Sequence, residues 1–414
     1  MSKRRNGECS IFAYRNGYAA YAWVTTPGGE RKRKWVYGKT HDEVHAKWIK
    51  LQGEASKGPV PTNVPTVSHY MNYWLCEVVK PNLAPKTYER YEAFTRLHIA
   101  PYLGMKRLDK LQVKDIRQWL NKLALVCQCC AQGKDAARPE GKRRCCAVGQ
   151  CCHAILSARS RADARDTLRA AYTCAVEDEL LSRNPVAVIR LPAPRTRKRR
   201  WWTVDDARRF LESTRAAGEP LYAAFVLILV LGLRKGEVLG LTWELVNLDT
   251  ADLYVGEQVQ RVGRALIRRQ VKTETSEAPL PLPELCVAAL KLRLQQQGAD
   301  RDRADGAWIE TGLVFTTRHG TALEPRNFNR SFDRCITKAQ VPRITVHGTR
   351  KTCGSLLAAL DVHPRVAMQI LRHSKISITM EIYTMVPDKA TLAALKRLGD
   401  ALSSPDAGLP DDGE

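Results

Sequence analysis

Aromatic and polar residues alternate near the start of the chain, from Ile11 to Tyr37. Two clusters of turn-forming residues interrupt this alternation, Asn16-Gly17 and Pro27-Gly28-Gly29. An alternation with a period of two is typical of half-buried strands, and such clusters are typical of the turns between them. The pattern therefore predicts three short antiparallel strands over residues 10–38.

A helix should follow these strands. Thr40 and Glu43 have the T-x-x-E spacing of a capping box, so we expect the helix to begin there and to run to about Ala55. Its apolar residues recur on the face that would cover the sheet: Val44, Trp48 and Leu51.

The third predicted strand is unusually basic. Its residues fall into two sets that point to opposite faces, with Arg31, Arg33, Trp35 and Tyr37 on one and Lys32, Lys34 and Val36 on the other. A basic face with aromatic side chains suits a DNA groove. A solvated charged face explains the pattern about as well.

Helical periodicity dominates the middle of the chain, from Val67 to about Leu125 and again from about Ser160 to Leu181. Prolines predict the helix boundaries within this stretch: Pro81, Pro85 and Pro101. We expect an all-helical module of four or five helices, preceded by a stiff proline-containing linker.

A basic linker, with five basic residues between Arg195 and Arg200, leads into the last third of the chain. The apolar run Leu221–Leu233 is shorter than the roughly 20 residues that cross a membrane, so it predicts a buried core helix. A strand-rich patch at 253–282 interrupts helices that continue to Leu402. Residues 403–414 are acidic and are expected to be disordered.

The net charge of the chain indicates what kind of partner it binds. The chain has 66 Lys and Arg against 43 Asp and Glu, and its net charge of +23 favours a polyanion, above all nucleic acid. A merely soluble basic protein is the alternative. Thirteen cysteines without an export signal indicate reduced thiols and a cytoplasmic protein.

Seven of these cysteines lie in one segment, 127–153, between the two helical stretches. Cys127 and Cys130 have C-x-x-C spacing, and Cys146 and Cys151 could complete a structural zinc site. A flexible surface loop or a redox-sensitive cluster remains open as an alternative.

Candidate chemistry concentrates after residue 200. Arg234 directly follows the buried apolar run, where a charge is costly unless it is paired or reserved for a ligand. His347 and Arg350 have the i, i+3 spacing that places them on one helical face. Lys272 lies between two predicted strands, where a hairpin would present it at its tip.

His373 and, ten residues later, Tyr383 complete the set. The order Arg, Lys, His-x-x-Arg, His, Tyr within one domain resembles the tyrosine recombinase (phage integrase) family. The flanking sequences also fit that family. They are Gly232-Leu-Arg-Lys-Gly-Glu around Arg234 and Leu371-Arg-His-Ser around His373.

The resemblance covers nearly the whole chain and implies a multidomain fold. It implies an α+β arm-type DNA-binding domain at 1–58, a three-stranded sheet plus helix. An all-α, SAM-like core-binding domain at 66–192 follows, with the cysteine-rich insertion 127–153. The mainly helical α+β catalytic domain spans 201–402.

The resemblance also implies a role for each residue of the set. Tyr383 would attack a DNA phosphodiester to give a 3′-phosphotyrosyl link, and Arg234 and Arg350 would clamp the phosphate oxygens. Lys272 would protonate the leaving 5′-oxygen and His347 would help to remove the tyrosine proton. His373 would hydrogen-bond the phosphate. Glu237 would orient these groups, and no cofactor or metal ion would be required.

The implied partner is double-stranded DNA at core and arm attachment sites, bound by a homotetramer that is a monomer in solution. An accessory directionality factor is compatible with this reading. A final helix, with Leu392, Leu395, Leu398 and Leu402, would dock on a neighbouring protomer or pack on its own domain.

Two other classes of protein share the scaffold. A type IB topoisomerase would not need the N-terminal sheet. A non-catalytic DNA-binding regulator would not need all six catalytic groups.

Overall fold

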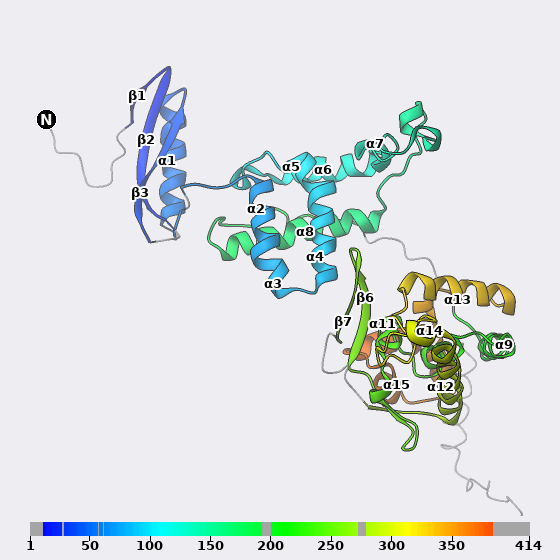
Figure 1. Cartoon of the computed structure of the whole chain (residues 1–414). Coiled ribbons are helices and arrows are strands. Elements are labelled where there is room, and N and C mark those ends of the chain that lie inside the picture. The colour runs from blue at the N-terminus through cyan, green and yellow to red at the C-terminus, as the bar shows by residue number, and fades with distance from the viewer. Residues whose placement is uncertain are drawn as a thin grey trace, which may run out of the picture. The chain divides into compact units, whose positions relative to one another are not determined.

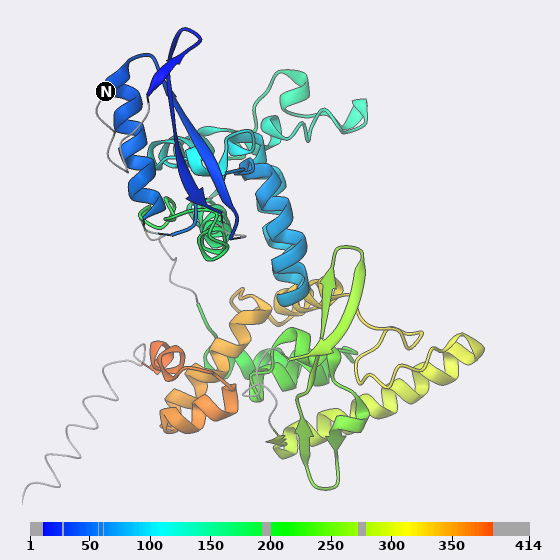
Figure 2. The ribbon, with the colours of Figure 1, turned by 90° about the vertical axis from the view of Figure 1, so that its left-hand side faces the viewer.

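The computed structural model describes residues 11–26, 29–56, 58–60, 62–192, 200–271 and 279–383 (Figures 1 and 2). The chain divides into two compact units, Met1–Thr196 and Arg197–Glu414. Lys272, most of the basic linker, the predicted last helix and the acidic tail lie outside the described residues.

The predicted N-terminal sheet is confirmed. Its strands are β1 (Phe12–Tyr14), β2 (Gly17–Thr25) and β3 (Arg31–Gly38), antiparallel in this order, and α1 (His41–Ala55) lies along one side of them (Figure 1).

Thr40 caps α1, and its hydroxyl accepts the Glu43 N–H at 3.2 Å. The Glu43 carboxylate accepts the N–H of Lys39, at 2.8 Å, instead of the N–H of Thr40. Val44 and Leu51 are buried against the sheet, and the Trp48 indole N–H donates to the Tyr21 carbonyl. The predicted covering face of α1 is therefore correct.

The other face of the sheet carries aromatic and basic side chains. The Arg33 guanidinium lies 4.9 Å from the centre of the Tyr21 ring and 4.8 Å from that of Trp23. Trp35 lies against Tyr21 with a ring separation of 5.0 Å and remains exposed. These residues form an aromatic–basic face of stacked rings and cations, held at the surface by cation–π contacts.

Two long helices open the helical module, and each contains a π-helical turn. The first comprises α2 (Val67–Tyr73), a π-helix (Trp74–Val79) and α3 (Lys80–Asn82). The second comprises α4 (Pro85–Phe94), a π-helix (Thr95–Ile99) and α5 (Ala100–Leu103).

The predicted boundary at Pro85 is correct, since α4 begins there, whereas Pro81 and Pro101 lie one and two residues before the ends of their helices. A proline lacks the N–H and its ring collides with the carbonyl four residues earlier. The residue before each proline donates instead to a carbonyl five residues back, Lys80 to Leu75 and Ala100 to Thr95. The widened turn accommodates the ring, so the helix continues.

The remaining long helices of the module are α6 (Val113–Leu125) and α8 (Ala158–Glu177). Their core includes Tyr70 and Tyr172, and the buried Tyr172 hydroxyl donates to the Leu108 carbonyl. The prediction that the last helix reaches Leu181 is wrong. The chain turns at Glu179, whose φ of 57° is left-handed.

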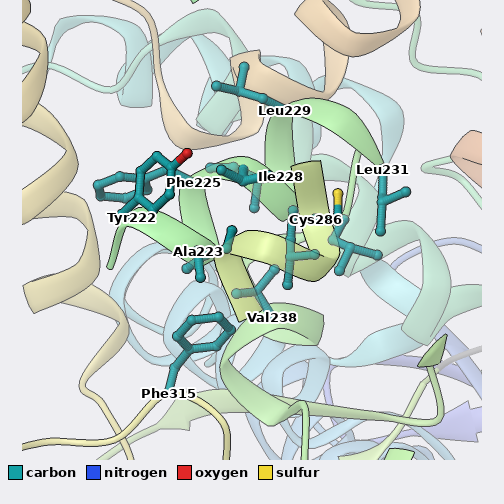
Figure 3. Close-up of a cluster of buried hydrophobic side chains, with 14 of the residues drawn as sticks. Tyr222, Ala223, Phe225, Ile228, Leu229, Leu231, Val238, Cys286 and Phe315 are labelled. Carbon is teal, nitrogen blue, oxygen red and sulfur yellow. The ribbon is translucent and has the colours of Figure 1, made fainter. Parts of the chain in front are cut away.

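The second unit is built around α10 (Tyr222–Val230), the predicted core helix. Its side chains fill the centre of a large apolar cluster with Val238, Cys286 and Phe315 (Figure 3). The other helices are α9 (Val204–Ala216), α11 (Lys235–Gly240), α12 (Glu284–Ala304), α13 (Pro325–Ala339), α14 (Val346–Ala359), α15 (Pro364–Leu371) and α16 (Ile376–Tyr383). Among the described helices, none is both long enough and apolar enough to cross a bilayer.

Two small sheets accompany these helices. The strands β6 (Glu257–Val262) and β7 (Ala265–Gln270) form a hairpin that stands out in Figure 2. The strands β4 (Val246–Asn247), β5 (Asp252–Tyr254) and β8 (Pro279–Pro281) form the other sheet. The strands that flank Lys272, β7 and β8, belong to different sheets, and Lys272 itself lies outside the described residues, so its place at a hairpin tip stays a prediction.

Candidate active site

The turn after α10 positions the first arginine. Gly232, with φ of 60°, reverses the chain, and Arg234 becomes the N-cap of α11. The Arg234 backbone N–H donates to Glu237 Oε2 at 2.8 Å, and its guanidinium donates to Glu237 Oε1 at 2.6 Å. Glu237 thereby orients Arg234, in keeping with the supporting role expected for it.

Arg350 is buried on α14, with 4% of its surface exposed. Its Nη1 donates to the Gly232 carbonyl at 2.6 Å, whereas its buried Nη2 has no hydrogen-bond partner among the described residues. Burial, and next the neighbouring Arg234, lower the pKa of Arg350 to about 9. The group therefore stays charged at neutral pH and keeps one strong donor for an anion.

A third arginine, Arg372, joins this site although sequence analysis assigned it no role. Its Nη2 donates to Glu237 Oε2 at 2.7 Å, and its Nε and Nη1 have no partner among the described residues. Arg372 adopts a left-handed conformation at the end of α15, with φ of 50°. Its position directly before His373 could have marked Arg372 as a site residue in the sequence, but only the fold shows that it is buried.

A cavity of about 330 Å³ lies beside these groups. The predicted i, i+3 pair of α14 does face one space, because the polar residues that line the cavity are Arg234, Lys235, Asn329, Thr345, His347 and Arg350. Lys235, another residue without a predicted role, donates to Asn329 Oδ1 at 3.0 Å. Burial lowers the pKa of Lys235.

His373 follows Arg372 directly. Its Nδ1 lies 2.9 Å from the Thr379 hydroxyl. Burial, followed by the positive charges of Arg350 and Arg234, lowers the pKa of His373 to about 4. The imidazole is therefore neutral at pH 7 and acts as a hydrogen-bonding group.

Tyr383 ends α16, a helix that packs against α14 and α15. Its hydroxyl donates to the Val362 carbonyl at 2.6 Å, and burial raises its pKa. Because α16 packs against α14, Tyr383 lies on a helix that neighbours the one carrying Arg350. The structure thus gathers Arg234, His347, Arg350 and His373 and places Tyr383 on the adjoining helix.

Arg234 and Arg372 share the Glu237 carboxylate, and Arg350 bonds to the Gly232 carbonyl instead, so the three guanidinium groups leave a net positive charge at this partly buried site. Planar guanidinium groups match the non-bridging oxygens of a phosphodiester. Tyr383, on the adjoining helix α16, carries a hydroxyl of the kind that can form a covalent phosphate ester. The site is therefore that of an enzyme that transfers a nucleic acid phosphoryl group through tyrosine.

Comparison with known proteins supports this class. The sequence profile of the Phage integrase family matches residues 200–389, and that of the Phage integrase, N-terminal SAM-like domain matches residues 66–124. A tyrosine recombinase XerC-like protein of Caldanaerobacter subterraneus subsp. tengcongensis is 27% identical over 93% of this chain and 97% of its own. An integrase of Streptomyces ambofaciens is 26% identical over 87% and 88%. The integrase of Mycobacterium phage D29 is 24% identical over 92% and 94%.

Solved structures share the fold. The Tn1549 transposon integrase in complex with transposon right end DNA superposes with a TM-score of 0.62 at 19% identity, covering 81% of this chain and 99% of that chain. A lambda integrase dimer bound to a core site gives a TM-score of 0.51 at 17% identity, covering 92% and 96%.

The chain belongs to the phage integrase family. It is a site-specific tyrosine recombinase of the kind that phages and mobile elements use, and it binds DNA, cleaves it and rejoins it. The predicted family, fold class and activity are confirmed.

Proposed function

We propose that Tyr383 attacks the scissile phosphodiester while Arg234 and Arg350 hold the non-bridging oxygens. This proposal rests on the buried Nη2 of Arg350, which lines the cavity and has no hydrogen-bond partner within the part of the chain that the structure describes. The transition state spreads negative charge over these oxygens, and preorganised donors in a dry site stabilise it most. The product is a 3′-phosphotyrosyl ester and a free 5′-hydroxyl.

The proton transfers fall to the other members of the set. His347, on the first turn of α14 and at the cavity, assists removal of the Tyr383 proton. Neutral His373 hydrogen-bonds the phosphate, and Lys272 protonates the leaving 5′-oxygen. The phosphotyrosyl ester retains the energy of the broken bond, so rejoining needs no ATP.

Arg372 and Lys235 extend this set. Arg372 acts through Glu237, whose carboxylate it shares with Arg234, and so positions the phosphate clamp. Lys235 lies at the cavity with a pKa lowered by burial and adds positive charge where DNA would approach. Neither residue replaces Lys272 in the proposed proton transfer.

We also propose a role for the other two domains of the chain. Residues 66–192 bind the core site and residues 1–58 bind a second, arm-type site through the aromatic–basic face. Four protomers assemble on DNA from monomers in the bacterial cytoplasm, with a directionality factor as an accessory. The outcome is integration or excision of a phage or mobile element.

A suicide substrate tests the catalytic part. A nicked core-site duplex that loses a short strand after cleavage should trap a covalent adduct, which mass spectrometry should map to Tyr383. Tyr383→Phe should bind the duplex with unchanged affinity and form no adduct. Tyr254→Phe, which alters another tyrosine of the same unit, should form the adduct at the wild-type rate.

An adduct that survives Tyr383→Phe would refute the nucleophile. Strand joining between two separate duplexes then distinguishes integration from the simple relaxation of supercoils.

The arm assignment has its own test. Arg33→Ala should weaken binding to arm-type duplexes and reduce the salt slope of that binding by about 1, because one phosphate contact is lost. Core-site cleavage should not change. Equal loss at core and arm duplexes would contradict the assignment.

A further inference from the structure

The insertion between α6 and α8, residues 127–153, has a core of cysteine side chains instead of aliphatic ones. Its buried cluster consists of Cys127, Cys129 and Cys145, with Cys146 packed against them. A segment of this size cannot bury a sufficient hydrophobic core, and chains below about 40 residues usually depend on disulfides or metal ions. The insertion therefore needs a cross-link that its side chains must supply.

The thiols of the insertion form two adjoining groups. The Sγ atoms of Cys129, Cys145, Cys146 and Cys152 lie within 4.8 Å of one another, as do those of Cys127, Cys130 and Cys151. The two groups meet where Cys127 Sγ lies 3.8 Å from Cys152 Sγ. Sequence spacing paired Cys146 with Cys127 and Cys130, whereas the fold places it in the other group.

The separations fit metal ligands better than disulfides. The Sγ atoms of Cys129 and Cys145 are 3.4 Å apart and those of Cys130 and Cys151 are 3.7 Å apart. A disulfide would require about 2.0 Å. A Zn–S bond of about 2.3 Å in a tetrahedral site places two ligand sulfurs about 3.8 Å apart.

Two features hold the ligand loops in place. Asp135 is fully buried, and its carboxylate accepts the N–H groups of Cys145 at 2.9 Å and Ala147 at 3.1 Å while pairing with Arg138. The helix α7 (Gln128–Ala131) presents Cys129 and Cys130 on consecutive positions. A buried carboxylate that accepts several backbone N–H groups fixes the conformation of the loop that supplies them.

We propose that these seven cysteines bind two zinc ions as thiolates, with Cys152 bridging them. Two four-coordinate ions need eight ligand positions, so seven ligands suffice when one is shared. Cys152 belongs to the first group, and its Sγ lies 3.8 Å from Cys127 Sγ of the second, so we assign it as the shared ligand. Thiolates are soft ligands that select zinc over magnesium or calcium.

Charge balance agrees with this arrangement. Two Zn²⁺ and seven thiolates carry a net charge of −3. The insertion has five basic side chains, Lys134, Arg138, Lys142, Arg143 and Arg144, against the two acidic side chains of Asp135 and Glu140. The cluster and its surroundings would be neutral together. The site is independent of the recombination chemistry.

Metal analysis of the full-length protein tests the proposal. Protein purified under reducing conditions without chelator should contain two zinc ions per chain, and X-ray absorption should show zinc surrounded by four sulfurs at about 2.3 Å. Cys152→Ser should lose half of the zinc or more. Cys76→Ser, at an exposed cysteine outside the insertion, should retain both ions.

A second measurement tests the proposal on the wild-type protein, in case Cys152→Ser fails to fold. Titration of the wild-type thiols with a mercurial should release two zinc ions into a chromogenic chelator. Release of one ion or none, iron in place of zinc, or intact disulfides among the seven cysteines would overturn the proposal. Tyr383→Phe should still hold two ions, so failure of the catalytic assignment would leave this result unchanged.

Discussion

Arg372 and Glu237 form an ion pair that is nearly closed to solvent, with 2.7 Å between Nη2 and Oε2 and side-chain exposures of 1% and 3%. The same carboxylate binds both the backbone N–H and the guanidinium of Arg234. One side chain from α11 therefore ties the first arginine of the site to the residue before His373. In the mechanism that we propose, the geometry of the phosphate clamp depends on this carboxylate.

Glu237→Gln tests that dependence. The substitution keeps the shape but leaves Arg372 without its counter-ion, and breaking a buried pair costs about 3 to 5 kcal/mol. We expect a loss of unfolding free energy of this size, measured with urea, and a parallel fall in adduct formation. Glu324→Gln removes the partner of Arg261 in a half-exposed pair and should cost less than about 1 kcal/mol.

Arg350→Lys tests the clamp itself. Lysine keeps a positive charge but cannot donate to the Gly232 carbonyl and to a phosphate oxygen with one planar group. Cleavage of the suicide substrate should slow by about 100- to 1,000-fold, with DNA affinity little changed. Arg208→Lys, at an exposed position on α9, is the matched control. A cleavage rate within threefold of wild type would argue against the clamp.

The depressed pKa of His373 has a consequence for stability. Between about pH 6.5 and 4 the unfolded chain protonates this imidazole while the folded chain does not, so the free energy of unfolding falls as the pH falls through this range. His373→Gln cannot titrate and should remove this part of the pH dependence. Urea unfolding of both proteins at pH 7 and pH 5 measures the change in the free energy of unfolding between the two pH values. An equal change in the wild type and in His373→Gln would contradict the assignment.

Gly232→Ala should disturb both the turn and the clamp. Residue 232 has a φ of 60°, and an added Cβ would lie 2.6 Å from Leu371 Cδ2. Left-handed backbone at a residue other than glycine costs about 1 to 3 kcal/mol, and the contact with Leu371 adds to it. Gly263→Ala shares the positive φ but meets nothing within 4 Å. We expect only Gly232→Ala to slow DNA cleavage, because only that change displaces the carbonyl bound to Arg350.

Local patterns predicted the elements whose causes are local. The alternation around β2 and β3, the Thr40 cap and the apolar run of α10 each depend on neighbours a few residues away, and each prediction was correct. The helices end one residue after Pro81 and two residues after Pro101, because a π-turn before each proline accommodates its ring. The strands on either side of Lys272 pair in different sheets, because strand pairing is decided by contacts far apart in the sequence.

The residue types of the site, their order and their family were determined by the sequence alone, since chemistry resides in side chains. The tertiary structure decided which of them share a buried space. It brought Arg372 of α15 to Glu237 of α11 and sorted the seven cysteines into two groups. Burial and charge compensation arise from contacts between segments far apart in the chain, and no spacing along the sequence reports them.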